Sequence, residues 1–221
     1  MTRTFKIIGW VLMATLATAV TLVSLRYFFF TPEKVTDANF SVHFSEHIFM
    51  FLTHVFGGTI ALLLGPLQFW GKFRNRRLSA HRWLGRIYLM GILIGGSGGL
   101  YMAFVSYGGL PTHIGFGMLA SLWLTTGFLA YRTIRRGDTQ AHRIWMIRNY
   151  SLTFAAVTLR LWIPTFMALG FSFLETYTTV AWIAWVPNLL IAEIYINRRQ
   201  PQSVKDLSMR IAKEPSVTVE I

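Results

Sequence analysis

Three long stretches of this chain contain no Lys, Arg, Asp or Glu, and they constrain its fold more than any other feature. They cover residues 48–71, 87–131 and 176–192. A bilayer core of ~30 Å is crossed by about 20 mostly apolar residues of helix. Charged residues make up only 14% of the chain, against roughly 25% in soluble domains. The sequence therefore predicts an all-α integral membrane protein, and the absence of cysteine excludes disulfides and cysteine metal sites.

Six transmembrane helices are expected. The middle stretch is long enough for two spans, and Gly108, Gly109 and Pro111 supply the turn between them. The predicted spans are about Ile7–Leu25, Ile48–Trp70, Ile87–Tyr107, Thr112–Tyr131, Asn149–Leu169 and Thr178–Tyr195. The first could instead be a signal peptide with a cleavage site at residues 17–19. An uncleaved span is favoured, because the apolar run continues to Leu25.

The basic residues lie mostly on one side of these spans. In a six-span arrangement, 18 of the 21 Lys and Arg residues fall at the N-terminus, in residues 72–86 and 132–148, or in the C-terminal tail. Because Lys and Arg concentrate in cytoplasmic loops, we expect a bacterial inner (cytoplasmic) membrane protein with both termini cytoplasmic. This bias explains the net charge of +12 without nucleic acid, and the expected contact is the lipid bilayer.

The two basic loops share a pattern that indicates an internal duplication. Residues 76–83 and 135–145 both contain an Arg pair, a candidate helix N-cap (Ser79, Asp138), Ala-His-Arg and a Trp. The pattern predicts a parallel repeat of helix pairs with a period of about 60 residues. A chance match between two Arg-rich loops is the alternative, and the shared Ala-His-Arg favours duplication.

Four histidines occupy positions related by this repeat. His54 and His113 are 59 residues apart near the periplasmic side, and His81 and His142 are 61 apart near the cytoplasmic side. Each pair connects alternate helices, which are diagonal partners in a four-helix bundle. Two facing imidazoles are the ligands of a low-spin haem. The spacing therefore predicts two haem b groups, whose iron atoms would be bound by His54 with His113 and by His81 with His142.

Glycines support the same interpretation. Gly58, Gly85 and Gly117 each follow a histidine by four residues, which is one turn along the same helix face. A missing side chain there would make room for a flat macrocycle, whereas His142 is followed by Met146. The alternatives are that each histidine only contacts the membrane interface and that the glycines serve helix packing.

Other candidate sites are weaker. His43 and His47, with Glu46, have a spacing that could hold a metal ion, although a solvated loop is the simpler interpretation. The sequence contains no G-x-S-x-G, no phosphate-binding glycine loop and no H-E-x-x-H, and no catalytic residue is assigned.

Two resemblances bear on function. His81-Arg82-Trp83-Leu84-Gly85-Arg86, after a span that ends Gly65-Pro66-Leu67-Gln68, resembles the core of the cytochrome b-561 di-haem superfamily over residues 54–107. That resemblance implies haem ligation by His54, His81, His113 and His142. Residues 48–170 look like a bacterial family of predicted membrane proteins of unknown function (domain of unknown function 2306), on the segments 141–148 and 158–162.

We therefore expect a b-type cytochrome that moves electrons across the membrane from a quinol or a soluble donor to an unknown acceptor. Residues 1–47 would form the first helix and a periplasmic segment, 48–170 the four-helix core, 171–197 the sixth helix and 198–221 a cytoplasmic tail. Arg82, Arg143 and Arg160 are candidate partners of haem propionates or of a quinone. The alternative is a haem-free transporter or membrane scaffold whose cavity is lined by Arg160, Gln68, Asn188 and Glu193.

Overall fold

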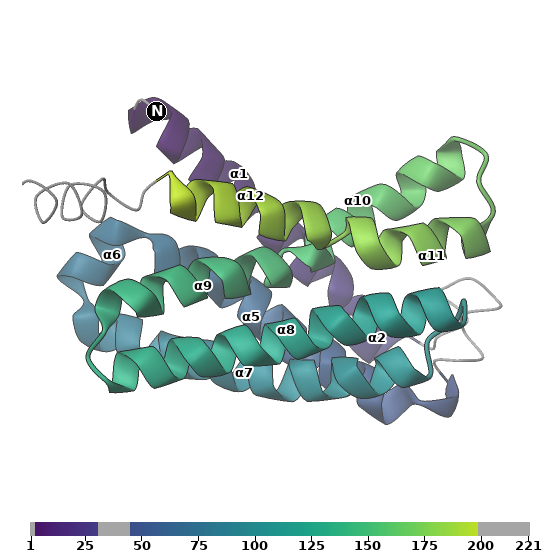
Figure 1. The fold of residues 1–221 in the computed structure, drawn as a ribbon, viewed down its shortest axis with the longest axis horizontal. Coiled ribbons are helices and arrows are strands. Elements are labelled where there is room, and N and C mark those ends of the chain that lie inside the picture. The colour runs from purple at the N-terminus through teal and green to yellow at the C-terminus, as the bar shows by residue number, and fades with distance from the viewer. Residues whose placement is uncertain (1–2, 31–44, 199–221) are drawn as a thin grey trace, which may run out of the picture.

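The computed structural model describes residues 3–30 and 45–198, and within these ranges it contains helices and no strands (Figure 1). The helices are α1 (Arg3–Ser24), α2 (Arg26–Phe29), α5 (Ile48–Phe69), α6 (Gly71–Arg76), α7 (Leu78–Phe104), α8 (Leu110–Arg135), α9 (Thr139–Thr153), α10 (Ala155–Ala168), α11 (Phe173–Ile183) and α12 (Val186–Asn197).

Six segments are long and apolar enough to cross a membrane, so the all-α membrane fold and the six spans are confirmed. They are Ile7–Phe29, Ile48–Phe69, Leu78–Phe104, Leu110–Arg135, Thr139–Ala168 and Phe173–Asn197. The predicted turn is also present, because Gly108 and Gly109 adopt φ values of 100° and 71°, which favour glycine.

Two helices begin earlier than the charge pattern predicts. α7 begins at Leu78 and α9 at Thr139, because Arg is a good helix former and its long side chain reaches the membrane interface from within a helix. The Asp138 carboxylate caps α9 by accepting a hydrogen bond from the amide of Ala141 at 2.8 Å. The expected cap at Ser79 is wrong, since Ser79 lies inside α7 and Arg77 occupies the N-cap position.

Helices α5, α7, α8 and α9 form a four-helix bundle in chain order (Figure 1). α9 closes the bundle against α5, where the Tyr150 hydroxyl donates to the carbonyl of Leu62 at 3.2 Å. The diagonal pairs are therefore α5 with α8 and α7 with α9, as the repeat predicts. We call the end with the α6–α7 and α8–α9 connections the basic end, and the end with the α7–α8 and α10–α11 connections the opposite end.

The fifth span is broken between α9 and α10, and the break shapes the opposite end. The Thr153 hydroxyl donates to the carbonyl of Asn149 at 3.0 Å, a contact that bends helices. Beyond Phe154, α10 leans away from the bundle (Figure 1), and α11 returns to pack on α8, where Gly115 meets Ala181.

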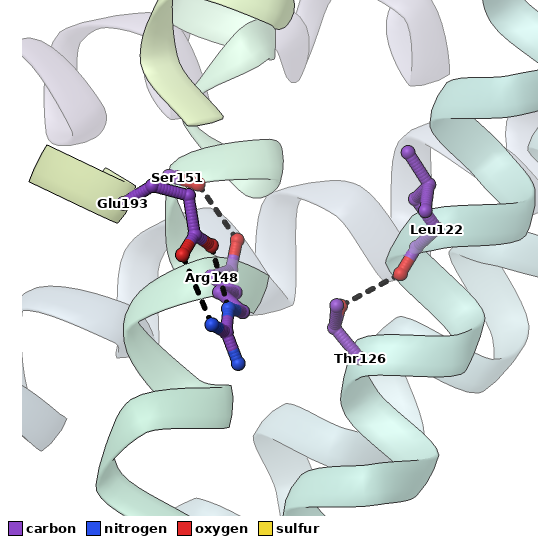
Figure 2. Close-up of polar contacts among 5 residues, drawn as sticks. All are labelled: Leu122, Thr126, Arg148, Ser151 and Glu193. Carbon is purple, nitrogen blue, oxygen red and sulfur yellow. Dashed lines mark hydrogen bonds and ion pairs between the residues drawn. The ribbon is translucent and has the colours of Figure 1, made fainter. Parts of the chain in front are cut away.

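A surface ion pair attaches the last span to the bundle. The Arg148 guanidinium on α9 donates through Nε and Nη2 to the Glu193 carboxylate on α12, at 2.6 and 3.0 Å (Figure 2). The Ser151 hydroxyl donates to the carbonyl of Arg148 at 2.7 Å (Figure 2). Arg148 therefore has a structural role, and its guanidinium also lies 4.6 Å from the centre of the Trp145 ring.

Candidate functional site

A cavity of about 380 Å³, here called the main cavity, lies between the bundle, the α1–α2 junction and helices α10 and α11, toward the opposite end. This volume falls in the range of small-molecule sites, roughly 300–1,000 Å³. Its wall is mostly apolar and rich in aromatic side chains, among them Tyr27, Phe51, Phe116, Trp123 and Phe173. The departure of α10 from the bundle creates this space.

His54 projects into the main cavity from α5. Its Nδ1–H donates to the carbonyl of Gly95 at 2.8 Å, because a carbonyl oxygen only accepts. The neutral ring then has a lone pair on Nε2, and the one hydrogen bond of His54 to a described residue is made through Nδ1. The imidazole and the Trp123 ring pack edge to face, with 6.3 Å between ring centroids. His54 is thus oriented to accept a hydrogen bond or to bind a metal through Nε2.

Arg160 lines the same cavity from α10. Its Nη1 donates to the carbonyl of Ala156 at 2.9 Å and its Nη2 to the hydroxyl of Ser24 at 3.0 Å. The Tyr27 hydroxyl also interacts with the guanidinium. Among the described residues no carboxylate pairs with Arg160, so a cation in the membrane-spanning region keeps unused N–H donors.

His113 does not share this cavity with His54. Its Nε2–H donates to the carbonyl of Ser106 at 3.0 Å, and the side chain borders a separate shallow groove between α7 and α8, with Leu100, Phe104 and Gly117. The structure therefore does not bring the two predicted ligands of the first haem together.

His81 and His142 lie on helix faces that meet deeper in the bundle. Tyr88 and Asn149 lie seven residues after these histidines, which is two turns along the same helix faces. The Tyr88 hydroxyl donates to the Asn149 Oδ1 at 2.6 Å, so these faces of α7 and α9 meet in the bundle centre. The His142 Nδ1–H donates to the carbonyl of Ala130 at 2.8 Å.

Unused hydrogen-bonding capacity lies beside His81. The buried Nδ1 of His81 and the buried Nε2 of Gln68 have no hydrogen-bond partner in the described part of the chain. A Cβ added at Gly85, one turn from His81, would meet only the Oε1 of Gln68, at 3.4 Å. Gln68 and His81 therefore flank the same glycine from neighbouring helices.

The three glycines that follow histidines differ from the other glycines of α5, α7 and α8. A Cβ would meet nothing within 4 Å at Gly58 and only the Cβ of Ala103, at 3.9 Å, at Gly117. Every other glycine of these three helices packs so tightly that a Cβ would come to 3.0 Å or closer to a neighbour; these are Gly57, Gly65, Gly91, Gly95, Gly96, Gly98, Gly99, Gly115 and Gly127. Gly58, Gly85 and Gly117 are not packing glycines.

The remaining predicted site residues lie apart from the main cavity and from the region between His81 and His142. Arg82 and Arg143 are exposed at the basic end. His47 is the N-cap of α5, and its Nδ1 lies 3.2 Å from the Tyr101 hydroxyl, while His43 lies outside the described residues. No cluster of three or more His, Asp or Glu side chains suited to a metal ion occurs in the described ranges. 

Of the four residues expected to line a transporter cavity, only Arg160 borders the main cavity. The Asn188 side chain donates to Thr158 Oγ1 at 3.1 Å, Glu193 pairs with Arg148, and Gln68 lies beside Gly85.

A polar layer that was not predicted from the sequence lies between the two histidine levels. The Tyr88 hydroxyl lies 3.1 Å from Thr153 Oγ1, and the Trp123 indole donates to the same oxygen at 2.8 Å. Asn149 Nδ2 donates to the carbonyl of Trp123 at 2.8 Å and to Thr126 Oγ1 at 2.9 Å. Tyr88 and Asn149 are themselves 61 residues apart, like His81 and His142, and that spacing was the available signal.

Comparison with known protein families identifies the family of the chain. The model of a family described as "Predicted membrane protein (DUF2306)" matches residues 51–196, which is more than half of the chain. No curated protein and no solved structure matches. The resemblance of residues 54–107 to the cytochrome b-561 superfamily therefore has no support from these comparisons.

Proposed function

The chain belongs to the DUF2306 family of predicted membrane proteins, and we propose that it acts in the membrane as a b-type haem protein that carries electrons. The proposed haem site lies at the basic end, between His81 and His142. These are the two predicted ligands whose helix faces meet across the bundle.

The contrast among the glycines carries this proposal. A planar macrocycle beside a ligating histidine needs a helix surface without a side chain, and Gly85 provides one next to His81. If Gly85 served only helix packing, a Cβ there would collide with a neighbouring helix, as at the nine tightly packed glycines. The unpaired Gln68 Nε2 beside it is a free donor for an oxygen of a bound group.

Haem b, when bound through two imidazoles, supplies one-electron transfer at an iron that no longer binds oxygen. The chain's own residues hold and enclose it. His142 is fixed by the hydrogen bond from its Nδ1–H to the carbonyl of Ala130, which directs Nε2 away from that carbonyl and fixes the tautomer. The Tyr88–Asn149 hydrogen bond closes the bundle two turns deeper. Arg82 and Arg143 lie next to the two histidines and are exposed, so they are available to carboxylates at the surface.

The proposal covers one haem. A second haem at the opposite end, between His54 and His113, stays a prediction, because the two side chains border different hollows. The electron donor would be a quinol or a soluble reductant.

The absorption spectrum of the purified protein tests the proposal. After expression with added haem precursor, the reduced-minus-oxidised spectrum should contain the bands of a low-spin b haem. Gly85→Leu should abolish these bands by filling the space beside His81. Gly58→Leu is the matched control, because it places the same side chain at the other end of the bundle and should leave them unchanged. A colourless wild-type protein would overturn the proposal and favour the haem-free transporter or scaffold.

A further inference from the structure

The main cavity contains polar groups that the proposed haem site does not use. His54 and Arg160 are enclosed by the surrounding helices, yet both keep part of their surface open to the cavity. Neither points toward His81 or His142, which lie about 14 residues further along the bundle, or roughly 20 Å at 1.5 Å per residue. The cavity is therefore a separate site.

His54 and Arg160 would bind different atoms of a ligand, because one accepts a hydrogen bond and the other donates. His54 donates its Nδ1–H to Gly95 and so offers a lone pair on Nε2, which accepts a hydrogen bond from an O–H or N–H. Arg160 uses its bonds to Ala156 and Ser24 and offers further N–H donors, which need an acceptor oxygen. A simple anion would satisfy Arg160 but would face the His54 lone pair. An apolar molecule would leave both groups unpaired at a cost.

The apolar and aromatic wall of the main cavity favours a ligand whose remaining part is a flat, apolar ring. Phe51 lies on α5 and Phe116 and Trp123 lie on α8, so two bundle helices supply aromatic walls, and Leu159 and Ile163 line the cavity from α10. Aromatic walls favour a flat ring, which stacks or packs edge to face. Helices α5, α7 and α8 cross the membrane along the cavity, so the bilayer is the source from which a partly apolar ligand would enter.

We propose that the main cavity binds a membrane-soluble hydroxyaromatic molecule of the quinol class, with one hydroxyl donating to His54 Nε2 and another oxygen accepting from Arg160. Gly58 lines the cavity close to His54, and a Cβ there would meet nothing within 4 Å. Gly58 therefore leaves room for the ring one turn from the imidazole. This site does not depend on haem at the basic end.

Native mass spectrometry of the detergent-solubilised protein, titrated anaerobically with decylubiquinol, tests this site. Wild type should take up one molecule saturably. Arg160→Gln and His54→Leu should each weaken binding by about tenfold to a hundredfold, which is the size expected for a lost hydrogen bond to a charged group or an orienting acceptor. Gly58→Leu should abolish binding, whereas Gly9→Leu, at an open glycine of α1 outside the cavity, should not change it.

Two further probes and one variant separate the alternatives. Decylbenzene, which has no oxygen, should not bind, and decanoate should bind more weakly than decylubiquinol. His81→Ala should keep full binding even if it removes haem, so this site and the proposed haem site can fail independently. Tighter binding of decanoate than of decylubiquinol, or unchanged decylubiquinol binding in Arg160→Gln and His54→Leu, would overturn the proposal.

Discussion

Two adjacent glycines of α5 should respond in opposite ways to the same substitution. A Cβ at Gly57 would collide with backbone atoms of Gly91 and Gly95 on α7, whereas a Cβ at Gly58 would meet nothing within 4 Å. Both changes to Ala gain about 1 kcal/mol of helix propensity. Only Gly57→Ala must push α5 and α7 apart, because the atoms it meets are backbone and cannot rotate away. Overpacking costs about 1–3 kcal/mol in well-packed cores, and this case belongs at the upper end.

The propensity gain is common to both variants, so the difference between them isolates the helix contact. We expect Gly57→Ala to be less stable than Gly58→Ala by about 3 kcal/mol, with Gly58→Ala equal to or slightly more stable than wild type. Unfolding of the detergent-solubilised protein by added dodecyl sulfate, followed by far-ultraviolet circular dichroism, measures the difference. Equal stabilities of the two variants, or a Gly58→Ala variant less stable than Gly57→Ala, would refute the assignment of Gly57 to packing and Gly58 to open space.

Two other changes test the polar contacts by the same assay. Tyr88→Phe should lower the free energy of unfolding by about 1–2 kcal/mol, since it leaves the buried Asn149 Oδ1 without its donor. Tyr101→Phe, at an exposed tyrosine, is the control and should change this free energy little. Equal effects of the two variants would contradict the role of the buried polar layer. Arg148→Met should lower the free energy of unfolding by about 1 kcal/mol, because it leaves the Glu193 carboxylate unpaired. The double variant Arg148→Met/Glu193→Leu should recover part of that loss. A double variant that is less stable than Arg148→Met would contradict this expectation.

The spans could be predicted from the sequence because crossing a bilayer imposes an apolar length that few other structures share. The helix starts at Leu78 and Thr139 could not be placed from charge alone. Arginine continues a helix into the interface as readily as it marks a loop. The N-cap at Asp138 could be predicted from the sequence. Ser79 has an equally good capping side chain, but the N-cap of α7 is Arg77.

The repeat predicted that the helix faces of His81 and His142 meet, as the Tyr88–Asn149 hydrogen bond shows, but it did not predict the separation of His54 from His113. Gly95, which accepts the hydrogen bond from His54, corresponds to Ala156 in the second copy, 61 residues later. α7 runs straight past Gly95, whereas Ala156 lies in α10, beyond the break at Phe154. His113 therefore lacks the neighbouring helix that orients His54, and it bonds to Ser106 instead. No Pro or Gly marks that break, and a single threonine at position 153 is too common inside helices to predict it.

The haem-to-protein ratio of single histidine variants, measured by pyridine haemochrome, tests the central claim most directly. Wild type should contain about one haem per chain, His81→Ala and His142→Ala should each lose it, and the double variant should be no worse, because coupled ligands of one site are not additive. His54→Ala, His113→Ala and His47→Ala should keep it. A ratio near two that falls to one in both pairs of variants would restore the two-haem prediction and contradict the single site, and haem retained by His81→Ala and His142→Ala would contradict haem binding at the basic end.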